Sequence, residues 1–160
     1  MIAEYESADK PLLYGAPRQY GLTQTHKHLP EMKEICGLNN LPIFCPIVAD
    51  FDRGMEVTVP LFSKDIKTDL NGIKEIYKNA YNGKIVKFND CADESGFLSA
   101  MSMRGRDDME ISVFGNDQRM LLCARFDNLG KGASGAAIQN MNILLGVDEC
   151  AGLVIGDVEK

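Results

Sequence analysis

Alternation of apolar and polar residues predicts most of the strands in this chain. Apolar side chains occupy every second position from residue 55 to residue 61, the pattern of a strand with one buried face. Pro60 cannot donate a backbone hydrogen bond, so we expect it at the end of this strand or on a sheet edge. Further strands are expected at 84–88, 97–104, 109–114 and 120–126. The last two flank the polar loop 115–118 and predict a hairpin.

Helical periodicity predicts three helices. The first spans the apolar positions Leu70, Ile73, Ile76, Tyr77, Ala80 and Tyr81, with Thr68 as N-cap and Asn82-Gly83 as the stop. A second helix is expected from Pro30 to Gly37, and a third from about residue 134 to residue 145. Strands and helices in this order predict an α+β fold, with a largely antiparallel mixed sheet covered by helices.

Length and charge narrow the class of protein. A chain of 160 residues has the size of one domain, and 45% hydrophobic with 25% charged residues is ordinary globular composition. The net charge of −6 comes with no stripe of Lys and Arg, so we expect no nucleic-acid partner. No apolar run approaches the roughly 20 residues of a membrane span, and no signal peptide is recognised. We therefore expect no membrane association and a cytoplasmic location.

The five cysteines argue against a disulfide framework. Their number is odd, and no two of them form a C-x-x-C pair, so a zinc site is not indicated either. Cys45 and Cys123 lie in apolar, strand-like runs. We expect both to be buried and to act as small hydrophobic residues.

The first candidate site is the segment His26-Lys27-His28-Leu29-Pro30-Glu31, which holds the only two histidines of the chain. In an extended segment both rings would project to one face, beside the N–H groups and positive dipole end of the helix expected at Pro30. Histidine is suited to proton transfer near neutral pH. The alternatives are two surface histidines or a metal pair, although no third metal ligand is indicated.

The second candidate site is the glycine-rich segment 127–142, which precedes and begins the third helix. It lacks the spacing of a phosphate loop and of a dinucleotide-binding strand–loop–helix unit. Three glycines, Gly130, Gly132 and Gly135, allow the backbone to approach a neighbouring group closely. The residues alone indicate a helix start packed tightly on another element or on a ligand.

Three ordered segments resemble N-acetyl-γ-glutamyl-phosphate reductases. The segment D-N-L-G-K-G-A-S-G-A-A-I-Q-N-M-N-I-L-L-G, from Asp127 to Gly146, resembles the C-terminal signature of that family. T-H-K-H-L-P-E-M resembles its H-x-H-x-P-E segment, and Arg53-Gly54-Met55 its R-G-[IM] segment. The resemblance covers about residues 20–146. It implies a fold like the C-terminal domain of glyceraldehyde-3-phosphate dehydrogenase, paired as a homo-oligomer.

The resemblance also implies a reaction and roles for particular residues. The family reduces the acyl phosphate N-acetyl-glutamyl 5-phosphate to N-acetyl-glutamate 5-semialdehyde with NADPH, in arginine biosynthesis, through a cysteine thioester. His26 or His28 would be the acid/base residue, with Glu31 orienting it or contacting substrate. Arg53 would clamp the phosphate or the α-carboxylate, unless it forms a surface ion pair. The implied nicotinamide contacts are Asn128, Gly130 and Gly132.

The chain departs from the family pattern in two respects. No cysteine stands in the glycine-cysteine-aromatic motif of the nucleophile, and no G-x-G-x-x-G fingerprint is present. We expect one domain over 1–160, with residues 1–127 binding substrate and dimerising. Residues 128–146 would pack on an absent NADP-binding domain, and the isolated fragment would be inactive. The alternatives are a reductase of carrier-protein-linked aminoadipyl or glutamyl phosphate, and a non-catalytic dimerising or binding module.

Overall fold

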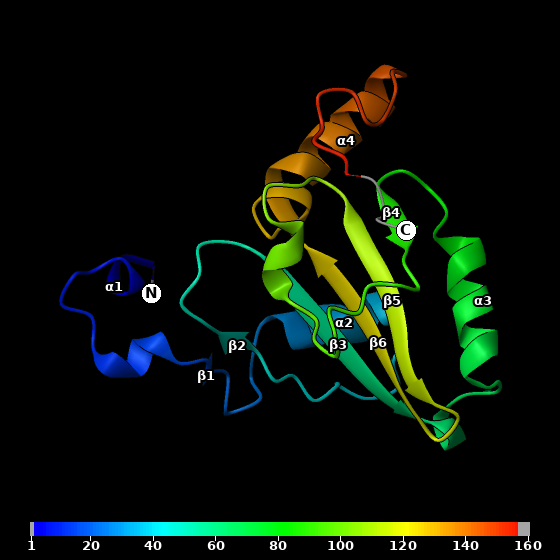
Figure 1. Ribbon diagram of the computed structural model, residues 1–160, viewed down its shortest axis with the longest axis horizontal. Helices are drawn as coiled ribbons and strands as arrows, with labels where there is room; N and C mark the ends of the chain where they lie inside the picture. The colour runs from blue at the N-terminus through cyan, green and yellow to red at the C-terminus, as the bar shows by residue number, and fades with distance from the viewer. Residues whose placement is uncertain (1, 157–160) are drawn as a thin grey trace. The chain divides into compact units, whose positions relative to one another are not determined.

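The computed structural model describes residues 2–156, which form two compact units (Figure 1). The first unit ends at Asp52 and the second begins at Arg53. Met1 and residues 157–160 of the predicted domain lie outside the described residues. That residues 1–160 act as one domain stays a prediction.

The first unit is built from short elements. These are α1 (Ile2–Tyr5), a 3-10 turn (Leu12–Gly15), β1 (Arg18–Gln19), α2 (His28–Cys36) and β2 (Ile47–Val48). β1 pairs antiparallel with β2. The predicted second helix is confirmed as α2, and Gly37 ends it in the left-handed conformation, with φ of 62°. Leu29, on the first turn of α2, is buried.

A four-stranded mixed sheet forms the second unit. Its strands are β3 (Met55–Phe62), β4 (Val86–Phe88), β5 (Met109–Asn116) and β6 (Arg119–Phe126), in the order β3-β6-β5-β4. β3 and β5 are antiparallel to β6, whereas β4 is parallel to β5. The predicted hairpin is confirmed as β5–β6, and Pro60 lies on the edge strand β3. The predicted α+β fold with a largely antiparallel mixed sheet is therefore confirmed.

Helices of the second unit lie against one side and one end of the sheet. α3 (Leu70–Ala80) contacts β5 and β4, and α4 (Gly135–Leu145) follows a π-helical turn after β6 (Figure 1). The N-cap of α3 is Asp69, whose carboxylate accepts from the Gly72 N–H at 2.8 Å, so the prediction of Thr68 was one residue early. No helix within residues 2–156 is long and apolar enough to cross a membrane.

Three sequence-based expectations besides the N-cap are wrong. The apolar face of β3 is not buried, because Met55, Val57 and Val59 are 41%, 43% and 48% exposed on this edge strand. Residues 97–104 form no strand; they contain a 3-10 turn, Ala100–Met103, that buries Met103 while Phe97 stays 77% exposed. The 3-10 turn contacts β6 and β3 without joining the sheet as a strand. Cys45 is exposed, because the short strand β2 that follows it belongs to no large sheet, whereas the expected burial of Cys123 on β6 is confirmed.

The two faces of the sheet differ in polarity. Strand register places Glu56, Arg125, Glu110 and Lys87 in one row across all four strands. The opposite face carries apolar rows such as Val57, Ala124, Ile111 and Phe88. A charged row inside a sheet requires partners from another segment, and these come from the chain between β4 and β5.

Candidate functional site

The two histidines lie together in the first unit. Their ring centroids are 4.7 Å apart and their planes are inclined by 65°. The His26 ring is also 5.1 Å from the Phe44 ring and 6.1 Å from the Tyr20 ring. His26 is half-buried among these rings, whereas His28 is exposed. The sequence therefore predicted the pairing of the two histidines correctly.

The reason for that pairing differs from the expected one. The segment is not extended, because Lys27 already has helical angles (φ −55°, ψ −28°) and α2 begins at His28 itself. The His28 backbone N–H donates to Nδ1 of His26 at 3.3 Å, and this contact turns the His26 ring toward the helix start. Glu31 lies exposed in the first turn of α2, where a negative charge is favoured by the helix dipole.

Asp127 organises the glycine-rich segment of the second unit. Its carboxylate is 0% exposed and accepts from the backbone N–H groups of Gly105 at 2.6 Å, Leu129 at 2.8 Å and Gly130 at 3.0 Å. Burial raises the pKa of this carboxyl group, but the hydrogen bonds lower it by more, so the pKa lies below its ordinary value. Asp127 is therefore a fixed negative charge at the end of β6.

Arg53 forms an ion pair with Asp127. Its guanidinium Nη1 lies 3.8 Å from Asp127 Oδ2, and its side chain is 39% exposed. The next residue, Gly54, donates its N–H to Oδ1 of Asn128 at 2.8 Å. The structure thus brings Arg53 and Asn128 to the same loop cluster, which has Asp127 at its centre.

Close packing explains the glycines of this segment. A side chain at Gly130 would overlap the carbonyl oxygen of Arg106, and one at Gly135 would overlap the side chain of Asp107. Gly132 has more room, since a Cβ there would meet the Phe126 ring at 3.2 Å. Its N–H donates to the Asp127 carbonyl at 2.9 Å. Close packing on a neighbouring element therefore accounts for Gly130 and Gly135.

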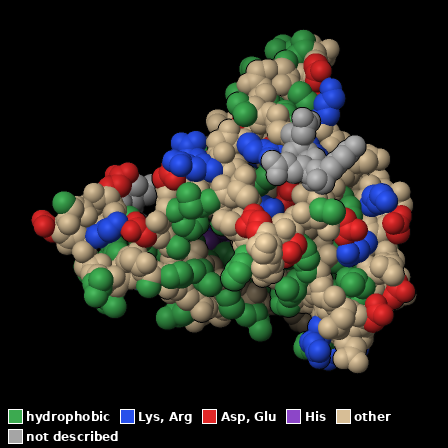
Figure 2. Space-filling model, viewed as in Figure 1, with side chains coloured by type: hydrophobic (Ala, Val, Ile, Leu, Met, Phe, Trp, Pro, Cys, Tyr) green, Lys and Arg blue, Asp and Glu red, His purple; other side chains and the backbone are tan. Residues whose placement is uncertain are grey.

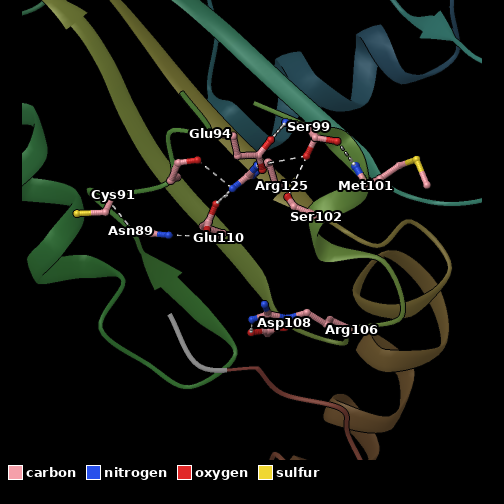
Figure 3. Close-up of polar contacts among 11 residues, drawn as sticks. Asn89, Cys91, Glu94, Ser99, Met101, Ser102, Arg106, Asp108, Glu110 and Arg125 are labelled. Atoms are coloured by element: carbon pink, nitrogen blue, oxygen red, sulfur yellow. Dashed lines mark hydrogen bonds and ion pairs between the residues drawn. The ribbon is translucent and has the colours of Figure 1, made fainter. Parts of the chain in front are cut away.

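A buried ion-pair network, which the sequence analysis missed, lies on the polar face of the sheet (Figure 3). Arg125 is 4% exposed; its Nε and Nη2 donate to Glu110 at 3.0 and 2.6 Å, and Nη1 donates to Glu94 at 2.5 Å. Arg125 also donates to the carbonyls of Ala92 and Ser99. These contacts hold the chain between β4 and β5 over the sheet. Charged residues inside otherwise apolar strands, as in M-E-I-S and C-A-R-F, were the available signal.

A second buried carboxylate lies at the start of β5, next to the residue that bonds the segment after α4. Asp108 is 0% exposed and accepts a forked pair of bonds from Arg106, at 2.8 and 2.6 Å, and an ion pair from Lys87 at 2.8 Å. Burial raises the pKa of Asp108, but these cations lower it by more, to below the ordinary value. The neighbouring Asp107 bonds Val154 through both its backbone N–H and its carboxylate.

No metal site is found in the described parts, and the face shown in Figure 2 carries no continuous basic surface. No group of three or more His, Cys, Asp or Glu side chains within residues 2–156 could hold a metal ion. On the face shown in Figure 2, Lys and Arg side chains are interspersed with Asp and Glu.

Comparison with known proteins places the chain in a family. Residues 5–128 match the family described as "Semialdehyde dehydrogenase, dimerisation domain". The chain belongs to this family. It is 41% identical over 144 residues to an N-acetyl-gamma-glutamyl-phosphate reductase 2 of Nostoc sp., a match that covers 84% of the chain and 45% of that protein. The corresponding reductase of Rhizobium etli is 42% identical over 153 residues, covering 91% of the chain and 49% of its own length.

These matches confirm the resemblance seen in the sequence. The semialdehyde dehydrogenase family also agrees with the α+β fold of the second unit. The chain spans about half the length of the relatives it matches. The roles of His26, His28, Glu31, Arg53, Asn128, Gly130 and Gly132 stay predictions.

Proposed function

We propose that this chain is the substrate-binding and dimerising half of an NADP-dependent acyl-phosphate reductase. The substrate would be N-acetyl-glutamyl 5-phosphate and the product N-acetyl-glutamate 5-semialdehyde. Relatives 40–42% identical are named as reductases of this substrate, which supports the proposal. Within the structure, the proposal rests mainly on one observation, the half-buried His26 ring paired with His28 beside the start of α2.

The histidine pair supplies the proton chemistry of the proposed reaction. Reduction of an acyl group to an aldehyde places negative charge on the carbonyl oxygen during the reaction, and a nearby imidazole N–H can stabilise that charge by donating a hydrogen bond. His26 or His28 takes this role, and Glu31 contacts substrate or orients the active ring. The cysteine nucleophile would come from a part of the protein other than this chain, because none of the five cysteines stands in the required motif.

Arg53 is proposed to bind the anionic end of the substrate. Its planar guanidinium suits a phosphate or carboxylate, and 39% of its side chain is exposed. Asp127 lies behind it with a fixed negative charge, which orients the guanidinium and keeps it from being an isolated cation before substrate arrives. Asp127 thus supports the proposed substrate contact of Arg53, although the two residues are far apart in the sequence.

The residues of the 128–132 loop fit a nicotinamide cofactor in one respect. The Oδ1 atom of Asn128 accepts from Gly54, which fixes the carboxamide, while Nδ2 donates to no atom within residues 2–156. That Nδ2 group would bond the nicotinamide amide, with Gly130 and Gly132 in the adjoining backbone. NADPH would supply the hydride. Exposed apolar residues of α4 support packing on a nucleotide-binding domain: Met141, Ile143, Leu144 and Leu145.

A homo-oligomer is part of the proposal. The matched family is described as a dimerisation domain. The edge strand β3 leaves Val57 and Val59 43% and 48% exposed, which is apolar surface suited to burial against a second copy.

Ligand titration of the isolated chain tests the proposed substrate site. A non-hydrolysable phosphonate analogue of N-acetyl-glutamyl phosphate should shift the NMR signals of the His26 and His28 rings and of the Arg53 guanidinium. The variant Arg53→Gln should weaken binding at least tenfold, whereas the matched control Arg119→Gln, on the hairpin, should not. No shift at either site at millimolar analogue would contradict the proposal. The isolated chain should not oxidise NADPH with the acyl phosphate. Appreciable turnover would refute the claim that this chain is inactive alone.

A further inference from the structure

Gln24 is bonded to a segment twenty residues away. Its side-chain Oε1 accepts the Phe44 backbone N–H at 2.9 Å, and its Nε2 donates to the Phe44 carbonyl at 2.7 Å. The carboxamide thus pairs with both polar groups of one peptide segment, as a neighbouring strand would. Gln24 thereby ties the loop that precedes the histidines to the loop that carries Phe44.

The backbone at Gln24 is held in an unfavourable conformation. Its φ is 56°, in the left-handed region that glutamine seldom adopts, and its N–H donates to the Gly21 carbonyl at 3.0 Å. Within residues 2–156 only Ser95 shares this feature among residues other than glycine. Such strain persists where the surrounding contacts enforce it, and here the side-chain contacts are the two bonds to Phe44 and a longer bond from Nε2 to the Gly21 carbonyl at 3.3 Å.

Phe44 and His28 together fix the His26 ring. The Phe44 ring meets the His26 ring edge-on at 5.1 Å, a favourable geometry for two aromatic rings. On the other side, the His28 N–H donates to Nδ1 of His26. A neutral imidazole that accepts at Nδ1 carries its proton on Nε2. The two contacts therefore define both the plane of the ring and the nitrogen that donates.

We propose that Gln24 is a positioning residue of the histidine site. Through Phe44 it holds the His26 ring in the orientation in which Nδ1 accepts from His28 and Nε2 carries the N–H that would donate to the substrate oxygen. The catalytic consequence rests on the proposed function, and it assigns to His26 the N–H that stabilises the substrate oxygen, with His28 contributing its backbone. The effect on the His26 ring orientation requires no substrate. It involves only residues of the first unit: Gln24, His26, His28 and Phe44.

NMR spectroscopy of the ¹⁵N-labelled 160-residue chain tests the proposal without substrate. At about pH 8.5, where an ordinary imidazole is neutral, long-range ¹H–¹⁵N spectra should show His26 predominantly as the Nε2–H tautomer. NOEs should connect its ring to Phe44, and the Phe44 amide should be protected from exchange. The variant Gln24→Gly permits the positive φ and removes the side chain together with its carboxamide.

The variant should lose the His26–Phe44 NOEs, shift His26 toward a tautomer mixture and speed Phe44 amide exchange by about tenfold. The control Thr23→Ala, one residue away, should change none of these signals. A Gln24→Gly chain with unchanged NOEs and tautomer would overturn the proposal. If that variant does not fold, Phe44→Leu decides: it keeps the backbone bonds, so an unchanged His26 tautomer there also overturns it. Failure of the analogue to bind, with these signals as expected, would count against the proposed function alone.

Discussion

Replacing Asp127 by asparagine tests whether its buried carboxylate organises the glycine-rich loop. Oδ2 of Asp127 accepts from Gly105 and faces Arg53, while Oδ1 accepts from Leu129 and Gly130. Asparagine keeps one oxygen for the two Oδ1 bonds, but it turns an N–H₂ group toward the Gly105 N–H. We therefore expect the variant to lose one bond fully and to weaken the other two.

The expected loss in the free energy of unfolding depends on how exposed the hydrogen-bond donors are. A lost bond to a buried charge costs about 1–3 kcal/mol, and the lower end applies because water reaches the exposed Gly105. The two remaining bonds lose their charge assistance, which adds about 0.5 kcal/mol each. Asp127→Asn should therefore lower the free energy of unfolding by about 2 kcal/mol. At an m-value of about 1 kcal/mol per molar urea, the midpoint shifts by about 2 M.

Urea titrations followed by NMR give this value for the second unit alone, through the methyl signals of Val113 and Met120. Because the folded-state pKa of Asp127 lies below its unfolded value near 3.9, its contribution is complete above about pH 5. It is lost as the pH falls through the folded-state pKa, so the difference between the two proteins should shrink below pH 4. The control Glu75→Gln changes an exposed carboxylate on α3. A difference at pH 7 no larger than that of the control would refute the reasoning.

Three further predictions concern the sheet. Gly115→Ala should lower the free energy of unfolding by about 2 kcal/mol and lower the melting temperature, because φ is 120° and a Cβ would overlap the Arg119 carbonyl. The control Gly83→Ala should be nearly neutral, and equal melting temperatures of the two variants would contradict the prediction. Glu110→Gln should lower the free energy of unfolding, measured in urea, by about 3 kcal/mol, because buried Arg125 loses the negative charge that it pairs with. A loss below about 1 kcal/mol would argue against a stabilising ion-pair network. Burial raises the pKa of the Cys123 thiol, so mass spectrometry should find it alkylated more slowly than exposed Cys36; similar rates would show an open sheet face.

Local patterns predicted the elements whose identity is decided within a few residues. The alternation at 55–61, the polar turn between β5 and β6, and the glycine after α2 each specify their own conformation. The strand predicted at 97–104 does not form, because Met103 is buried from a 3-10 turn while Phe97 stays exposed.

The candidate site was predicted in part for a similar reason. The histidine pair was found because its members are two residues apart. Asp127 and Arg125 find partners 22 and 31 residues away, in Gly105 and Glu94, and no local pattern indicates such pairings. The roles of Gly130 and Gly135 were also ambiguous in the sequence, since close packing and ligand approach require the same residue type.

A chimeric reductase tests the central claim most directly. The matched half of the Nostoc reductase would be replaced by this chain, leaving the unmatched part of that protein in place. The account predicts a chimera that oxidises NADPH with N-acetyl-glutamyl phosphate, and loses at least a hundredfold in kcat on His26→Asn with little change in NADPH affinity. A folded chimera that binds NADPH yet shows no turnover with this acyl phosphate would contradict the account.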